Sequence, residues 1–223
     1  MKLSKYILPF VIFALPVITH AQAGIKPKAN DVTAPLHALK PDYKIPYGAP
    51  AVSNVTEVLN RIYNYLNAVT PAQFVDKRTG KVISDITNAD TNIILKQGDF
   101  RLTSYEWGVT YSGMLQAGEA TGDAKFTNYT KDRLNFIAGA VPAFYSLYER
   151  FPNPANPLRQ PVAPHALDDA GAVCAAMIKT LRSGGNANLR PVIDNLINYI
   201  STKEFRLPDG TLARTVLKKI RCG

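Results

Sequence analysis

The chain has 223 residues, of which 46% are hydrophobic and 19% are charged, a composition typical of a globular protein with a substantial core. Its formal net charge is +9, a value found among nucleic-acid-binding proteins. The basic residues do not form a stripe with interleaved aromatics, however, and part of the excess lies in the two terminal segments. The sequence therefore predicts no nucleic-acid partner.

The N-terminal segment has the pattern of a secretory signal peptide. Two lysines precede an apolar run over residues 6–18, and Ala21 and Ala23 have the A-x-A spacing of a cleavage site. The run is too short to span a bilayer, and the alternative is a buried N-terminal helix. We expect residues 1–23 to be removed, leaving no membrane anchor in a mature chain that is periplasmic or secreted in a Gram-negative bacterium.

The rest of the chain divides into a short lead-in and a helical region. Residues 24–50 are rich in proline and lack periodicity, so we expect an extended segment that lies over the fold. Residues 71–102 are mixed, with a turn at Thr79–Gly80 and a locally extended "DFRL" at 99–102. The spacing of apolar residues predicts helices at about 53–68, 106–121, 124–149, 167–183 and 188–202.

Several local signals refine these boundaries. Asn54 and Glu57 have the spacing of a capping box for the first helix. Glycines at 121–123 and 183–186 favour helix ends, because glycine tolerates the left-handed turn. Prolines between 152 and 164 predict that this segment is not helical.

An internal repeat indicates how the helices are arranged. Residues 112–137 align with residues 175–200, an offset of 63, and each copy has the pattern of a helix, a short glycine turn and a second helix. Stacked hairpins form an open solenoid or a closed ring. The first helix of each copy is small and apolar and the second is more charged, which favours an inner and an outer ring. The predicted fold is all-α, an incomplete (α/α)6 toroid of helical hairpins.

Two clusters of residues are candidates for a binding site. In "SYEWGVTYSG" (104–113), Tyr105, Glu106, Trp107 and Tyr111 combine aromatic faces and a carboxylate, groups that suit sugar binding. The alternative is that Trp107 packs in the core and that Glu106 interacts favourably with the helix dipole.

The second cluster lies in "PHALDDAG" (164–171), where His165, Asp168 and Asp169 precede an apolar helix. A carboxyl group there could act as an acid or base if burial raised its pKa. The alternative is that Asp168 caps the helix and Asp169 interacts with its dipole.

Metal and cofactor chemistry is not indicated. Cys174 lies within an apolar helical run, so we expect it to be buried and unpaired. No C-x-x-C, His/Cys ligand spacing, nucleotide-binding loop or Ser/His/Asp triad is visible in the sequence. We expect neither a metal nor a cofactor.

Three sequence runs together resemble glycoside hydrolase family 88/105, over about residues 105–214. They are "YEWGVTYSGMLQAGEATGDAKFTNYTKDRLNFI", "ALDDAGAVCAAMIK" and "FRLPDGTLAR". The resemblance implies an (α/α)6 toroid that removes a 4,5-unsaturated uronyl residue, glucuronyl or rhamnogalacturonyl, from oligosaccharides that lyases release from pectin and related polysaccharides. It implies protonation of the vinyl ether followed by addition of water, without a metal or organic cofactor.

The resemblance also assigns roles to residues. It implies a catalytic role for Asp168, in substrate binding and in support of a second aspartate, with Asp169 beside it. We assign Tyr105, Glu106, Trp107, Tyr111, His165 and Asp169 to substrate binding. The general-acid aspartate of the family lies in a W-L-D-D-M-like motif shortly after "PDGTLAR", and this sequence contains no such motif. We therefore expect residues 51–214 to be the N-terminal part of the hydrolase domain, and the chain to be inactive.

The segment 215–223 has an unusual explanation. Codons permitted for these residues, read in a shifted frame, encode RPEKNTLW, which matches the continuation of relatives. We expect an out-of-frame tail caused by one deleted base after Arg214, and an open L-D-D continuation in the other frame of the genomic DNA.

Two other functions stay open. One is a sugar-binding or structural helical-repeat protein, and the other is a polysaccharide lyase that uses His165 with Arg159.

Overall fold

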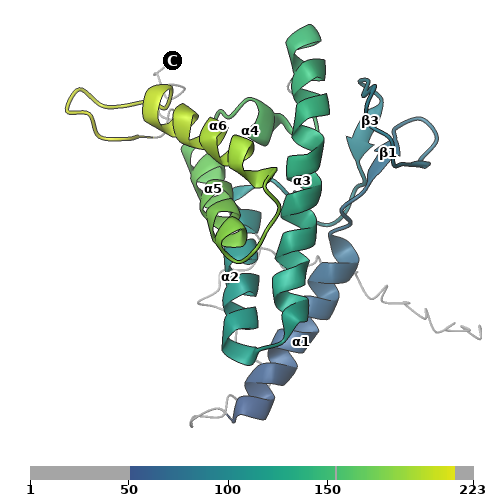
Figure 1. Ribbon diagram of the computed structural model, residues 1–223, viewed down its shortest axis with the longest axis vertical. Coiled ribbons are helices and arrows are strands. Elements are labelled where there is room, and N and C mark those ends of the chain that lie inside the picture. The colour runs from purple at the N-terminus through teal and green to yellow at the C-terminus, as the bar shows by residue number, and fades with distance from the viewer. Residues whose placement is uncertain (1–50, 154, 214–223) are drawn as a thin grey trace, which may run out of the picture. The chain divides into compact units, whose positions relative to one another are not determined.

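Helices make up most of the structure, and a small sheet accompanies them (Figure 1). The computed structural model describes residues 51–153 and 155–213; the predicted signal peptide (1–23), lead-in segment (24–50) and out-of-frame tail (215–223) lie outside them. The elements in chain order are α1 (Val52–Val69), β1 (Phe74–Asp76), β2 (Val82–Ile83), β3 (Ile93–Leu95), α2 (Tyr105–Thr121), α3 (Ala124–Arg150), α4 (Arg159–Val162), α5 (Leu167–Arg182) and α6 (Leu189–Thr202).

The prediction of an all-α fold is confirmed, and the five predicted helices all occur within one residue of their expected ends. The break between α2 and α3 follows from two residues. Gly122 adopts the left-handed conformation with φ of 70°, which ends α2. The carboxylate of Asp123 accepts a hydrogen bond of 3.0 Å from the backbone N–H of Lys125, which caps the start of α3.

Three local predictions were wrong. The capping box of Asn54 and Glu57 does not form, because α1 already begins at Val52, after Ala51, without a side-chain cap. Residues 99–102 form bends and a turn and belong to no strand. The proline-rich linker contains the one-turn helix α4 with Pro161 inside it. Proline is tolerated there because the N–H groups of a first helical turn have no partner within the helix.

Two helical hairpins, α2–α3 and α5–α6, occur among the described residues, as the repeat predicted. The two helices of each hairpin pack together, and the first helices, α2 and α5, pack along each other. This is the arrangement of a partial α/α toroid in which α2 and α5 belong to the inner ring. The α2–α5 contact is close because Gly108 has no side chain: a Cβ there would lie 2.4 Å from the carbonyl carbon of Ala172.

The core lies between the hairpins and is continuous with the contact to α1. Cys174 is buried in it as a free cysteine, as predicted. Arg133 on α3 is also buried, and its guanidinium Nε donates to the backbone oxygen and the hydroxyl of Thr70, both at 3.1 Å. The same guanidinium lies 3.7 Å from the ring centroid of Tyr129. These contacts join the C-terminal end of α1 to α3, and the largest fully buried side chains include Tyr111, Phe126, Tyr129, Leu134, Ile137 and Phe144.

The short antiparallel sheet has the strand order β2-β1-β3. It contacts the helices through Phe74, whose ring lies 4.7 Å from that of Phe136 and 4.9 Å from that of Phe144. The predicted turn at Thr79–Gly80 is confirmed, with Gly80 at φ of 69°. Within the ranges 51–153 and 155–213, every helix is too short or too polar to span a bilayer.

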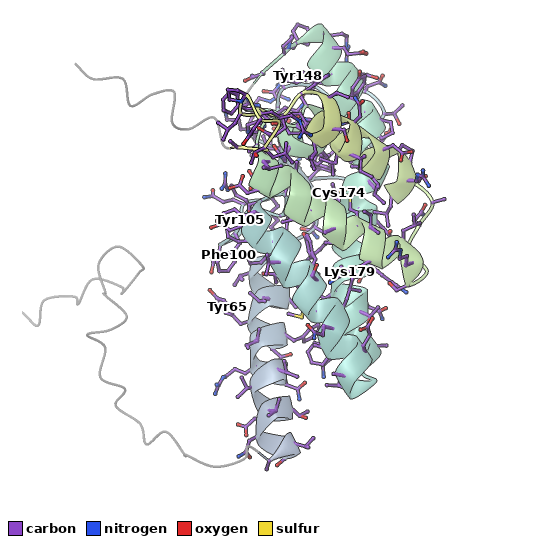
Figure 2. All side chains as sticks on the ribbon, turned by 90° about the vertical axis from the view of Figure 1, so that its left-hand side faces the viewer. Tyr65, Phe100, Tyr105, Tyr148, Cys174 and Lys179 are labelled. Carbon is purple, nitrogen blue, oxygen red and sulfur yellow. The ribbon has the colours of Figure 1, made fainter. Side chains whose placement is uncertain are left out.

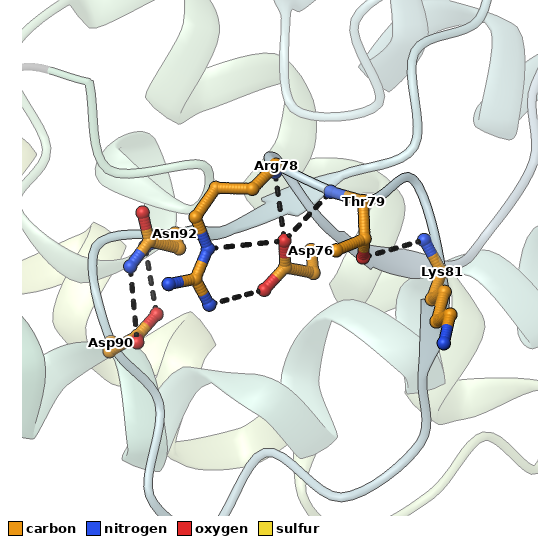
Figure 3. A network of polar contacts seen from close by, with 6 residues as sticks. All are labelled: Asp76, Arg78, Thr79, Lys81, Asp90 and Asn92. Carbon is orange, nitrogen blue, oxygen red and sulfur yellow. Dashed lines mark hydrogen bonds and ion pairs between the residues drawn. The ribbon is translucent and has the colours of Figure 1, made fainter.

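A polar network holds the β1–β2 turn (Figure 3). The carboxylate of Asp76 accepts backbone hydrogen bonds from Arg78 at 2.8 Å and Thr79 at 3.0 Å. The guanidinium of Arg78 forms an ion pair with the same carboxylate at 2.8 Å. Arg78 is the main reason why the pKa of Asp76 lies well below its usual value.

Candidate functional site

A polar pocket lies at the N-terminal ends of α2 and α5, and it encloses about 250 Å³. Its walls come from the loop before α2, from α4 with the loop before it, and from the start of α5. The lining residues are Arg101, Thr103, Ser104, Asn156, Pro157, Arg159, Gln160, His165 and Asp169. The helical repeat explains this position, because inner helices of stacked hairpins present equivalent ends on the same rim.

Asp169 links the two inner helices at this pocket. Its carboxylate oxygen accepts a hydrogen bond of 2.7 Å from the backbone N–H of Tyr105, the first residue of α2. Ser104, the residue before α2, provides no side-chain cap of its own. Asp169 therefore satisfies one of the unpaired N–H groups of α2 from a neighbouring helix, and its negative charge is favourable at the positive end of α2.

Two arginines give the pocket its positive charge. Within the part of the chain that the structure describes, the side chains of Arg101 and Arg159 form no ion pair or hydrogen bond with another residue. The pKa of Glu106 is lowered, mainly by a hydrogen bond from the Ser104 hydroxyl. The positive charge of Arg101 contributes more weakly to the same shift. Among the described residues, the lining of the pocket contains two arginines and one carboxylate, that of Asp169, and this excess of positive charge favours an anionic ligand.

Gln160 lines the pocket with a side chain that is almost fully buried. Its side chain is only 4% exposed, and its amide Nε2 donates to the backbone oxygen of Ala166 at 3.1 Å. Its Oε1 is buried and has no hydrogen-bond partner among the described residues. A buried acceptor without a partner is costly, so this oxygen lowers the stability of the pocket wall.

The two adjacent aspartates of α5 have different surroundings. Asp169 lines the polar pocket, whereas Asp168 does not. Asp168 accepts a hydrogen bond of 3.0 Å from the backbone N–H of Asp169, and it is close enough to Tyr199 to contribute to the raised pKa of that phenol. Burial of Tyr199 is the main cause of this shift, and Glu204, which accepts a hydrogen bond from the phenol, adds to it. The predicted catalytic role of Asp168 stays a prediction.

The structure brings only part of the first predicted cluster to the surface. Tyr105 and Glu106 lie exposed in the first turn of α2. Trp107 is 4% exposed, and its ring stacks on that of Phe100 with centroids 4.4 Å apart. Tyr111 is fully buried, with its hydroxyl donating to the backbone oxygen of Leu102 at 3.0 Å, and burial raises the pKa of this phenol. These positions do not test whether the four residues bind a substrate, so that role stays a prediction.

Sequence reasoning missed three residues near the pocket. Arg101 and Gln160 line it, and Phe100 lies directly before Arg101 with 40% of its surface exposed. Figure 2 labels Phe100 between Tyr65 and Tyr105 along one edge of the view. The signal for Phe100 and Arg101 was an aromatic flanked by charged residues, "DFR", a few residues before an inner helix. No group of three His, Cys, Asp or Glu side chains that could hold a metal ion occurs in the ranges 51–153 and 155–213.

Stacked hairpins with a polar pocket at the inner-helix rim are the arrangement of part of an α/α toroid. Comparison with family models agrees, because the model described as Glycosyl Hydrolase Family 88 matches residues 69–221. The chain belongs to this family, and at the family level it is a glycoside hydrolase that acts on unsaturated uronides. A search of the curated proteins found no match.

Proposed function

We propose that the polar pocket binds the 4,5-unsaturated uronyl residue at the non-reducing end of oligosaccharides released by lyases from pectin or rhamnogalacturonan. One observation carries the proposal: Arg101 and Arg159 line the same small pocket, and neither side chain forms an ion pair or hydrogen bond within the described part of the chain. An unsaturated uronyl residue carries one carboxylate. Guanidinium groups bind carboxylates through short, charge-assisted hydrogen bonds.

The other lining groups suit the rest of the sugar. The carboxylate of Asp169 is an acceptor for sugar hydroxyls. His165 offers a further polar contact at the exposed side of the pocket. The site therefore combines cationic groups for one carboxylate with acceptors for hydroxyl groups, which is the set of partners that a uronyl ring requires.

The chemistry follows from the substrate. Protonation of the vinyl ether at C4 leaves an oxocarbenium ion at C5, water adds there, and the resulting hemiketal opens with loss of the following sugar. By resemblance, one aspartate donates the proton and Asp168 supports it. Among the described residues, only one carboxylate, that of Asp169, lines the pocket, and it already accepts the Tyr105 N–H. We therefore propose that this 223-residue chain binds the sugar without turning it over, as an exported protein of the periplasm.

Titration calorimetry with the methyl glycoside of a 4,5-unsaturated uronic acid tests the binding proposal. We expect Arg101→Ala and Arg159→Ala each to weaken binding by about tenfold or more, because each removes a charge-assisted contact. The matched control is Arg190→Ala, which removes an exposed arginine paired with Asp194 on α6. The methyl ester of the same ligand, which has no carboxylate charge, should bind weakly to the unchanged protein.

Two results would contradict the proposal in different ways. Equal affinity for the acid and its methyl ester would mean that the arginines do not bind the carboxylate of the ligand. The absorbance of the C4–C5 double bond provides a separate test of turnover, since hydration removes it. A steady loss of this absorbance with purified protein, absent from a buffer control, would show that the chain is an active hydrolase.

A further inference from the structure

We propose that Phe100 is the stacking platform for the sugar that follows the uronyl residue, in a second pocket that opens beside the polar pocket. This inference rests on the proposed function, because it assumes that the uronyl ring occupies the polar pocket. It assigns a role to Phe100, which lies in the loop that joins β3 to α2, outside the sequence motifs that suggested sugar binding.

One face of the Phe100 ring packs on Trp107, and the residue is partly exposed to solvent. The buried Trp107 stacks on it, with ring centroids 4.4 Å apart and an angle of 24° between the planes. The ring of Tyr65 meets Phe100 edge-on, at 6.4 Å and 85°. Phe100 is nevertheless 40% exposed, so the face away from Trp107 remains accessible to a ligand.

Neighbouring contacts keep this platform in place. The hydroxyl of Tyr65 donates a hydrogen bond of 3.0 Å to the carboxylate of Asp99, the residue next to Phe100. The backbone N–H of Asp99 also donates to the carbonyl of Val69 at the end of α1, at 3.0 Å. A ring that is fixed before binding loses little conformational freedom when a ligand stacks on it.

The pocket beside Phe100 has a volume of about 450 Å³ and lies next to the polar pocket. Arg101, Thr103 and Pro157 line both, so the two pockets share a wall. In the proposed binding mode the ligand passes over this shared wall, with the uronyl ring on one side of Arg101 and the next sugar on the Phe100 side. The second pocket is also lined by Thr70, Lys96, Gln97 and Asp99, which place donors and acceptors around the aromatic surface.

This combination suits a pyranose ring. A pyranose has apolar C–H faces and a rim of hydroxyl groups, so it pairs a flat aromatic face with polar groups at the edge. The shared wall sets the order of the sugars: the anionic ring lies on the arginine side and the next ring on the Phe100 side. Phe100 would then determine affinity for the second sugar without affecting the uronyl ring, and Trp107 would support Phe100 from below.

Two ligands separate the two subsites. The methyl glycoside of a 4,5-unsaturated uronic acid fills only the polar pocket, and a disaccharide of the same uronyl residue linked to a neutral pyranose reaches both. We expect Phe100→Leu to weaken disaccharide binding by roughly three- to tenfold and to change methyl glycoside binding by less than twofold. Phe100→Tyr, which keeps the ring, should retain the affinity of the unchanged protein for both ligands.

Tyr145→Leu is the matched control, because Tyr145 is a similarly exposed aromatic (46%) on α3 that lines neither pocket. Ring-current shifts provide a readout that needs no variant. Protons on one face of the second sugar should move upfield in the NMR spectrum when the disaccharide binds the unchanged protein, because they lie over the Phe100 ring.

The outcomes distinguish this inference from the proposed function. If the unchanged protein binds the methyl glycoside but gains nothing from the second sugar, or if Phe100→Leu weakens both ligands equally, the Phe100 subsite is refuted and the polar pocket stands. If the unchanged protein binds neither ligand, both proposals are refuted. Selective loss of disaccharide affinity, together with the upfield shifts, supports the subsite.

Discussion

Replacing Gly108 by alanine should destabilise the protein by forcing α2 away from α5. An added Cβ would lie 2.4 Å from the carbonyl carbon of Ala172, and 2.7 Å from both its carbonyl oxygen and its Cβ. Two of these three atoms belong to the backbone of α5, so no rotation of a side chain can relieve the overlap. The helices must separate, or one must shift along the other.

The expected magnitude combines two opposing effects. Overpacking of a closely packed contact costs about 1–3 kcal/mol, and more where backbone must move. Alanine in place of glycine in a helix returns about 1 kcal/mol through its higher helix propensity. Because the overlap involves backbone, we expect the cost to lie at the upper end, with a net loss of about 2 kcal/mol. For a folded region of this size, that corresponds to a fall in Tm of about 4–8 °C.

The same helix offers a matched control. A Cβ at Gly113 would have no atom within 4 Å, so Gly113→Ala carries the gain in helix propensity without the overlap. Urea and thermal denaturation followed by circular dichroism should show Gly108→Ala to be less stable than the unchanged protein. They should show Gly113→Ala to be more stable, by about 0.5–1 kcal/mol. If the two variants shift stability in the same direction, the close approach of α2 and α5 at Gly108 is wrong.

Three further predictions concern polar contacts. Asp169→Ala should cost about 1 kcal/mol in urea denaturation because the Tyr105 N–H loses its acceptor, while Asp169→Asn, which keeps an oxygen there, should cost less. Arg133→Met should cost about 2–3 kcal/mol, because the buried backbone oxygen of Thr70 loses its donor; an unchanged urea midpoint would contradict this. The pKa of Asp76 is lowered on folding, so its stabilising effect is complete at neutral pH and is lost as the pH falls below the ordinary aspartate value of about 4. Asp76→Asn should remove that part of the acid dependence, as measured by urea midpoints across this pH range.

The helices were predictable because their signals are local. Apolar residues repeat at helical spacing along each segment, and glycine or aspartate marks the break at Gly122–Asp123. The repeat also predicted correctly that α2 and α5 would pack together. The three short strands had no comparable signal, since strands of two or three residues are too short to show alternation. The one-turn helix α4 was missed because its proline lies where a helix can tolerate it.

The candidate site was predicted only in outline. Residue types identified His165 and Asp169, and both line the polar pocket. The sequence could not distinguish Asp169 from the adjacent Asp168, because the faces of α5 that they occupy depend on what packs against that helix. Nor could it predict that Trp107 would lie under Phe100, since aromatic residues in a loop and in a helix look equally suited to bind a sugar.

The sequence by itself therefore determined the family, the helix boundaries and the pairing of the hairpins. Each of these depends on neighbours within a turn or on a pattern that repeats along the chain. The polar pocket depended on tertiary packing. It exists because the close contact at Gly108 brings the start of α5 against the start of α2, and because the loops before α2 and α4 then add Arg101 and Arg159. Burial and the meeting of charges from distant segments are properties of that packing, so only the folded structure could decide which polar residues face a common space.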